Sequence, residues 1–279
     1  MATEHAGAQR IAAAFAGAQG RAALMPYLMG GFPDVARSRV VGEAYADGGA
    51  DLVELGIPYS DPLADGPVIH AAGSMALRAG ATTAGVLEVC AALAPRLPVV
   101  AMCYANLVLA RGADAFARRL ADHGASGLIV PDLPLEEAPA VLEACDAAGV
   151  ALVPLVAPTT PDDRLARIGA RARGFLYTVS VTGTTGERTQ AGDVGAVLRR
   201  AKAATDVPVA LGFGIGTPEQ AAAAAAAGAD GVIVGSRLVR EVAELHAASP
   251  PELGRAMREL VASFAAGLRD EAPVAGADR

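Results

Sequence analysis

The chain has 279 residues, of which 53% are hydrophobic and 19% charged, and its formal net charge is −7. Much of the hydrophobic share is alanine, and no unbroken apolar run reaches the roughly 20 residues of a membrane-spanning helix. The first residues, Met1–His5, lack the basic and apolar blocks of a signal peptide, so we expect a cytoplasmic protein without membrane contact. A negative chain without a cluster of Lys or Arg is also not expected to bind nucleic acid.

Short apolar runs alternate with alanine-rich helical segments along the whole chain. The predicted strands are Leu24–Met29, Leu52–Leu55, Val99–Cys103, Gly127–Val130, Ala151–Leu155, Phe175–Val179, Val207–Phe213 and Gly231–Val234. The predicted helices are Ala8–Gly17, Asp34–Asp47, two within residues 67–95, Ala113–Asp122, Leu135–Ala148, Pro161–Ala170, Val194–Ala203, Pro218–Ala227 and Pro251–Leu268.

Apolar strands that alternate with helices predict a parallel sheet covered by helices, and hence an α/β fold. Eight strands at a fairly even spacing favour a closed (β/α)₈ TIM barrel with extra helices, including one before the first strand. An open doubly wound sheet is the alternative. We expect a single domain over residues 1–279, with an N-terminal helical segment at 1–20 and a flexible tail at 270–279.

The most informative stretch is Glu54-Leu-Gly-Ile-Pro-Tyr-Ser-Asp-Pro-Leu-Ala-Asp-Gly-Pro67, which begins at the end of the second predicted strand. A glutamate on a buried strand is unfavourable unless it is paired or used, because loss of water disfavours its charged form. Asp61 and Asp65 follow in a loop whose backbone is restricted by three prolines. A strand carboxylate and a loop carboxylate at a barrel mouth form a candidate acid/base pair, and a capped turn with one solvated acid is the alternative.

Two glycine-rich loops follow the seventh and eighth predicted strands, Gly212-Phe-Gly-Ile-Gly-Thr-Pro218 and Gly235-Ser-Arg237. Glycines let backbone N–H groups approach an anion, and a helix that begins at Ser236 favours negative charge at its start. These loops form the common phosphate site of TIM barrels, although the glycines could instead only permit tight turns. The small, polar loop 180–188 is either a lid over the site or an ordinary connection.

Several kinds of chemistry lack the residues that they need. Cys90, Cys103 and Cys145 have no metal-ligand spacing, the four histidines are scattered, and we therefore expect no metal site. Lys202 is the only lysine and lies in a predicted helix, which leaves Schiff-base catalysis without an obvious nucleophile. A carboxylate pair beside a phosphate site instead favours proton transfer, such as an isomerisation or a retro-aldol cleavage.

The chain closely resembles the family of tryptophan synthase α subunits at these residues. The Glu54–Pro67 stretch is similar to that family's signature, and the similarity extends from about Leu24 to about Leu268. The similarity continues in five further segments, namely Tyr104-Ala-Asn-Leu, Pro131-Asp-Leu-Pro134, Val181-Thr-Gly-Thr-Thr-Gly, Gly212-Phe-Gly-Ile215 and Val234-Gly-Ser236.

The resemblance implies a carbon–carbon lyase that cleaves indole-3-glycerol phosphate to indole and D-glyceraldehyde 3-phosphate. It implies that Glu54 moves a proton to and from indole C3 and the glyceryl hydroxyl, and that Asp65 holds the indole N–H. The resemblance implies that the phosphate is bound by Gly186, Phe213, Gly214, Gly235 and Ser236. It also implies that the walls and the lid of the indole pocket are formed by Tyr27, Met102, Ile129, Tyr177 and Thr185.

The resemblance also implies an α₂β₂ complex in which indole passes to a β subunit for L-tryptophan synthesis. Pyridoxal phosphate would belong to that β subunit, so no cofactor is expected in this chain. The segment 56–66, with Asp61, and the segment 181–192 would face the partner. Two other functions remain open: a barrel of low activity that mainly activates its β subunit, and another phosphate-binding TIM-barrel isomerase.

Overall fold

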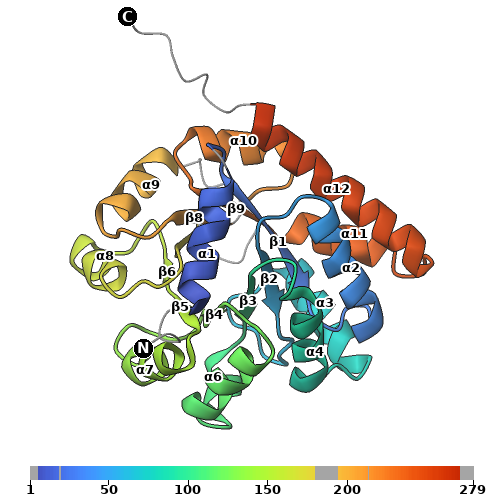
Figure 1. The fold of residues 1–279 in the computed structure, drawn as a ribbon, viewed down its shortest axis with the longest axis horizontal. Helices are drawn as coiled ribbons and strands as arrows, with labels where there is room; N and C mark the ends of the chain where they lie inside the picture. The colour runs from blue at the N-terminus through green and yellow to red at the C-terminus, as the bar shows by residue number, and fades with distance from the viewer. Residues whose placement is uncertain (1–5, 19, 180–193, 213, 271–279) are drawn as a thin grey trace, which may run out of the picture.

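The computed structural model describes residues 6–18, 20–179, 194–212 and 214–270, in which parallel strands form a nearly closed barrel inside a ring of helices (Figure 1). The strands follow one another in the spatial order β5-β4-β3-β2-β1-β9-β8-β7-β6. Their bounds are β1 Ala23–Met29, β2 Val53–Gly56, β3 Val99–Met102, β4 Gly127–Ile129, β5 Ala151–Val153, β6 Leu155–Val156, β7 Leu176–Val179, β8 Val209–Gly212 and β9 Gly231–Val234.

The fifth predicted strand is divided in two, which is the main difference from the expected strands. β5 pairs with β4 and β6 pairs with β7, and Pro154 alone separates them. Proline has no N–H to give to a neighbouring strand, but its carbonyl accepts a hydrogen bond of 3.0 Å from the Tyr177 N–H. The two ends of the sheet therefore meet within one continuous piece of chain, and the barrel prediction is confirmed over the open sheet.

The helices cover the outside of the strands, and most lie where the sequence pattern predicts them (Figure 1). Their bounds are α1 Ala6–Gly17, α2 Val35–Asp47, α3 Pro67–Arg78, α4 Thr83–Leu93, α5 Ala105–Leu109, α6 Ala113–Asp122, α7 Ala138–Ala148, α8 Asp162–Gly169, α9 Val194–Ala203, α10 Pro218–Ala226, α11 Ser236–Glu244 and α12 Pro250–Asp270.

Two helices differ from the expectation for local reasons. The sequence did not predict α5, because its five residues are too few to display a helical period. At the start of this helix, the Asp132 carboxylate accepts a hydrogen bond of 2.8 Å from the Ala105 N–H. The helix α7 was expected to begin at Leu135 but begins at Ala138. A turn precedes it, closed by a hydrogen bond from the Glu137 N–H to the Pro134 carbonyl.

The amino end of the barrel is closed by α1, which crosses the strands in Figure 1. The Gly7 N–H donates to the Gly149 carbonyl at 2.9 Å, and a side chain at Gly7 would strike the backbone of Ser126. Ile11 is fully buried in the barrel interior together with Met25 and Phe175. With this end filled, the carboxyl end remains for a ligand site.

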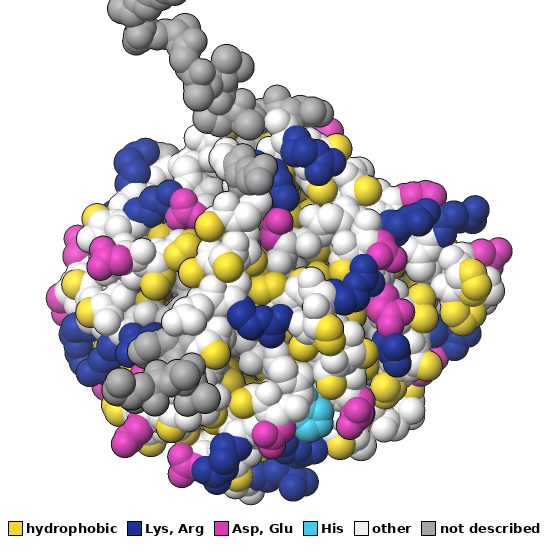
Figure 2. Space-filling model, viewed as in Figure 1, with side chains coloured by type: hydrophobic (Ala, Val, Ile, Leu, Met, Phe, Trp, Pro, Cys, Tyr) yellow, Lys and Arg dark blue, Asp and Glu magenta, His cyan; other side chains and the backbone are white. Residues whose placement is uncertain are grey.

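The apolar core has two layers, one inside the barrel and one between the strands and the outer helices. In the space-filling view, basic and acidic side chains are interspersed over the face that carries α1 (Figure 2). Within the described ranges, no single helix is long and apolar enough to span a membrane; the bent pair α3 and α4, at 109°, passes that test by length and composition together.

Candidate active site

A cavity of about 510 Å³ lies at the carboxyl ends of the strands. It brings together eight of the predicted site residues: Tyr27, Glu54, Asp65, Met102, Tyr177, Gly214, Gly235 and Ser236. Ile129 does not line this cavity and is fully buried within the barrel interior. The predicted residues Thr185, Gly186 and Phe213 lie outside the described residues.

Glu54 is the most deeply buried charged group of this cavity. Its side chain extends inward from β2, the residue is only 1% exposed, and Oε2 has no hydrogen-bond partner among the described residues. Burial, and then the negative charge of Asp65, raises the pKa of Glu54 to about 8. The glutamate is therefore mostly protonated at neutral pH, and its Oε2 can exchange a proton with a ligand.

Asp65 lies in the loop after β2 and is held by Tyr104. The Tyr104 hydroxyl donates to Asp65 Oδ1 at 2.8 Å and accepts the Ala64 N–H at 3.0 Å. Burial raises the pKa of Asp65, while the bond from Tyr104 and the nearby His70 act in the opposite direction. A hydrogen bond donated to a carboxylate favours its charged form, so the two acids of the cavity have different environments.

Two tyrosines line the cavity together with Glu54. Tyr27 on β1 is the register partner of Glu54, and Tyr177 lies on β7. Burial raises the pKa of both phenols; the charges of Asp65 and then Glu54 add to this effect at Tyr27, and the charge of Glu54 adds to it at Tyr177. Both groups therefore remain neutral hydroxyls, which can donate hydrogen bonds but cannot act as bases near neutral pH.

The other end of the cavity is suited to an anion. Gly214 has a φ of 78°, a left-handed conformation that favours glycine, and it follows β8. Gly235 follows β9, and α11 begins at Ser236, so that backbone N–H groups at the start of this nine-residue helix border the cavity. Arg240, from the same helix, also lines it and adds positive charge.

A family model described as "Tryptophan synthase alpha chain" matches residues 14–268. The chain belongs to this family. The tryptophan synthase alpha chain of Prochlorococcus marinus (strain MIT 9313) is 50% identical over 229 residues, which are 81% of this chain and 83% of that protein. The one from Carboxydothermus hydrogenoformans is 47% identical over 248 residues, 88% of this chain and 92% of that protein.

Solved structures agree with this assignment. A structure of Mycobacterium tuberculosis tryptophan synthase in space group F222 has 41% identity and a TM-score of 0.84, covering 93% of this chain and 98% of that one. The tryptophan synthase subunit alpha from Legionella pneumophila str. Paris has 33% identity and a TM-score of 0.83, covering 94% and 98%. The predicted TIM barrel and the family resemblance are thus confirmed, and the family is one of lyases.

Tyr104 is a further residue of the site, and its contacts become visible only in the fold. Its ring stacks on Tyr59 with centroids 5.4 Å apart, and the Tyr59 hydroxyl accepts from the Asn106 side-chain amide at 3.1 Å. These contacts fasten the loop after β2 to the residues that follow β3. The family similarity of the Tyr104-Ala-Asn segment and its place just after a strand both point to the barrel mouth.

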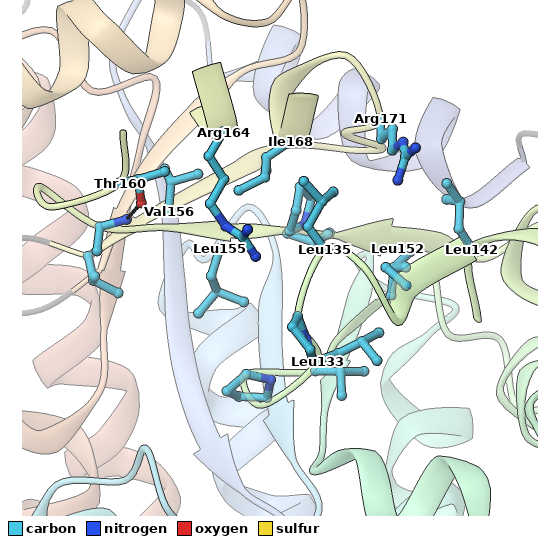
Figure 3. A pocket seen from close by; sticks show the side chains of 18 residues that line it. Leu133, Leu135, Leu142, Leu152, Leu155, Val156, Thr160, Arg164, Ile168 and Arg171 are labelled. Carbon is cyan, nitrogen blue, oxygen red and sulfur yellow. Dashed lines mark hydrogen bonds between the residues drawn. The ribbon is translucent and has the colours of Figure 1, made fainter. Parts of the chain in front are cut away.

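A second, smaller cavity of about 260 Å³ lies between the strand break at Pro154 and the helices α7 and α8. Figure 3 shows Arg164 extending from α8 over Leu155, with Leu133 and Leu135 nearby. Its walls are mainly apolar, and Arg164 is already engaged by both carboxylate oxygens of Glu136 at 2.8 Å. This cavity contains no acid pair, so we locate the candidate chemistry in the larger one.

Metal and Schiff-base chemistry find no site among the residues that the structure describes. No group of three or more His, Cys, Asp or Glu side chains there could hold a metal ion. Lys202 does not line the carboxylate cavity, and its ammonium pairs with Asp230 at 2.7 Å. The groups available at the cavity include two carboxyls, neutral phenols, backbone N–H donors and the guanidinium of Arg240.

Proposed function

We propose that the chain cleaves indole-3-glycerol phosphate into indole and D-glyceraldehyde 3-phosphate. The observation that carries this proposal is the buried Glu54, with its unpartnered Oε2, in one cavity with Asp65 and the anion-binding end. Membership of the tryptophan synthase alpha chain family supports the choice of substrate. No Schiff base or metal is needed for this reaction, because the protonated indole ring itself accepts the electrons of the broken bond.

Glu54 acts in both proton transfers. Its carboxylic acid, present at neutral pH because burial raises the pKa to about 8, gives a proton to indole C3. The carboxylate that results takes the proton of the hydroxyl on the adjacent glyceryl carbon. The carbon–carbon bond then breaks, its electron pair returns to the indole ring, and the aldehyde leaves. Glu54 ends the cycle protonated, as it began.

Asp65 and the glycine loops hold the two ends of the substrate. The Asp65 carboxylate, fixed by the Tyr104 hydroxyl, accepts the indole N–H and stabilises the positive charge that arises when C3 is protonated. Gly235 and Ser236 bind the phosphate through backbone N–H groups at the start of α11, and Gly214 binds it from the loop after β8. We assign the same phosphate role to Gly186 and Phe213, and lid closure to Thr185, from the family resemblance.

We further propose that the carboxyl-end rim docks a tryptophan synthase β subunit, as in an α₂β₂ complex, and that pyridoxal phosphate resides in that partner. Leu63, in the loop after β2, is 80% exposed, and Leu109 on α5 is 60% exposed. Asp61 is exposed beside Leu63, and the Ser60 hydroxyl donates to its carboxylate. Exposed apolar side chains next to the loop that carries Asp65 are suited to a partner that receives indole.

The decisive experiment measures indole released from indole-3-glycerol phosphate by the purified chain, alone and with a β subunit added. No indole in either sample would refute the lyase proposal. If the chain releases no indole alone and does so only when the β subunit is added, the activator function is favoured instead. Turnover of a sugar phosphate without indole release would favour an isomerase.

Two matched variants separate the roles of the loop acids. Asp65→Asn is expected to lower kcat by about a hundredfold or more, because it removes the charge that stabilises the indole cation. Asp61→Asn should leave cleavage by the isolated chain within about twofold but reduce stimulation by the β subunit. Equal effects of the two substitutions on the isolated chain would contradict this division of roles.

A further inference from the structure

Tyr27 occupies a special position in the carboxylate cavity. Its Cα is paired in register with that of Glu54 on the neighbouring strand, and both side chains line the cavity. The residue is 4% exposed, so its phenol cannot exchange freely with bulk water. A buried tyrosine hydroxyl ordinarily has a hydrogen-bond partner.

The partner that the described residues offer this hydroxyl is weak. Tyr27 Oη donates to the thioether Sδ of Met29 at 3.9 Å, and sulfur of this type is a poor acceptor. The hydroxyl lies against Gly56 on β2, where any added Cβ would collide with it. It therefore reaches the carboxyl end of β2 and keeps the capacity to donate to a better acceptor in the cavity.

The Tyr27 side chain also extends from one end of the site toward the other. A Cβ added at Gly235, in the anion-binding loop, would be 3.8 Å from the Cβ of Tyr27. On the other side, the charges of Asp65 and Glu54 follow burial as causes of the raised pKa of Tyr27. A substrate with its phosphate at Gly235 and its ring at Asp65 must carry its glyceryl chain past this phenol.

We propose that the Tyr27 hydroxyl donates a hydrogen bond to a hydroxyl oxygen of the substrate's glyceryl chain and so selects ligands with a hydroxylated linker. The inference rests on the proposed function and goes beyond the apolar wall that the family resemblance implies for this residue. The bond replaces the contact with Met29 Sδ when substrate binds, and it orients the chain whose other hydroxyl gives its proton to Glu54.

The test compares two ligands that differ only at the linker. Dissociation constants of indole-3-glycerol phosphate and of indole-3-propyl phosphate, which lacks the hydroxyls, are measured by calorimetry in the Glu54→Gln background, where the substrate is not consumed. Adding Tyr27→Phe should weaken binding of indole-3-glycerol phosphate about tenfold, equivalent to about 1.4 kcal/mol. It should change the dissociation constant of indole-3-propyl phosphate less than about twofold. Tyr45→Phe is the matched control, since this buried phenol donates to the Tyr27 carbonyl and does not line the cavity.

The outcomes separate this inference from the proposed function. Equal weakening of both ligands by Tyr27→Phe would assign the residue a packing role and overturn the inference, and so would unchanged affinity for both. If Tyr45→Phe reduced the difference in affinity between the two ligands as much as Tyr27→Phe does, the inference would also be overturned. Cleavage of indole-3-glycerol phosphate by the unsubstituted chain is measured in parallel, and its absence would overturn the proposed function together with the inference.

Discussion

Replacing Glu54 by glutamine should change how the stability of the fold depends on pH. The pKa of this carboxyl rises from 4.5 to about 8 on folding, because the carboxyl is buried in the native site and lies near Asp65. Between these values the native glutamate keeps its proton, while the unfolded one has lost it. Each increase in pH within this window therefore favours the unfolded chain.

The magnitude follows from the linkage relation. One pKa unit corresponds to about 1.4 kcal/mol, so the shift of Glu54 lowers the free energy of unfolding by ~3 kcal/mol at pH 7 and by ~5 kcal/mol above pH 8, relative to acidic solution. Glutamine has nearly the same shape and no charge to lose. The variant should match the unsubstituted chain near pH 4.5 and become progressively more stable than it up to about pH 8.

Urea unfolding at several values between pH 4.5 and 9 measures this difference directly. All other titrating groups are common to both proteins, so the difference between their two curves isolates Glu54. Glu259→Gln, at an exposed position on α12, is the matched control and should give a curve parallel to that of the unsubstituted chain. Parallel curves for Glu54→Gln as well would refute the reasoning, because they would mean that Glu54 ionises in the fold as it does in water.

Three further predictions concern activity and packing. If Glu54 must begin the cycle protonated, kcat/KM for indole release should fall above about pH 8, and a rise there would contradict its role as the acid. Tyr104→Phe should lower kcat about tenfold to a hundredfold by freeing Asp65, with little change in KM; an unchanged kcat would mean that another group holds that carboxylate. Gly212→Ala should lower the free energy of unfolding by about 1 to 3 kcal/mol in urea titrations, because the added methyl group collides with the Tyr177 ring, and unchanged stability would show that the ring can move aside.

Much of the fold could be predicted from the sequence because its signals are local. Apolar runs alternate with alanine-rich helices, and glycines such as Gly149, with a φ of 74°, end the helices where the pattern stops. The division of the fifth strand was missed because Pro154 lies in an apolar run that reads as continuous. Only the pairing of β5 with β4 and of β6 with β7 reveals that two short strands share this segment.

The candidate site was predictable where a residue's position along its strand decides its place. Glu54 lies in the short strand β2 and Gly235 directly follows β9, and both line the cavity at the carboxyl ends of the strands, as barrel geometry predicts. Ile129 is the last residue of its strand, yet it is buried in the barrel interior. The bond between Tyr104 and Asp65 joins residues 39 positions apart, and no local pattern contains it.

The instability expected from Glu54 and its proposed role have one physical origin. A buried carboxyl destabilises the fold at neutral pH because its proton must be retained there, and a retained proton is what the first step at indole C3 requires. Asp65 is less buried; burial raises its pKa too, but the bond that it accepts from Tyr104 acts in the opposite direction and favours the charged form needed beside the indole nitrogen. If solvation separates the two roles in this way, Glu54→Gln will gain stability and lose turnover over the same pH range. A variant that loses turnover without gaining stability would uncouple them.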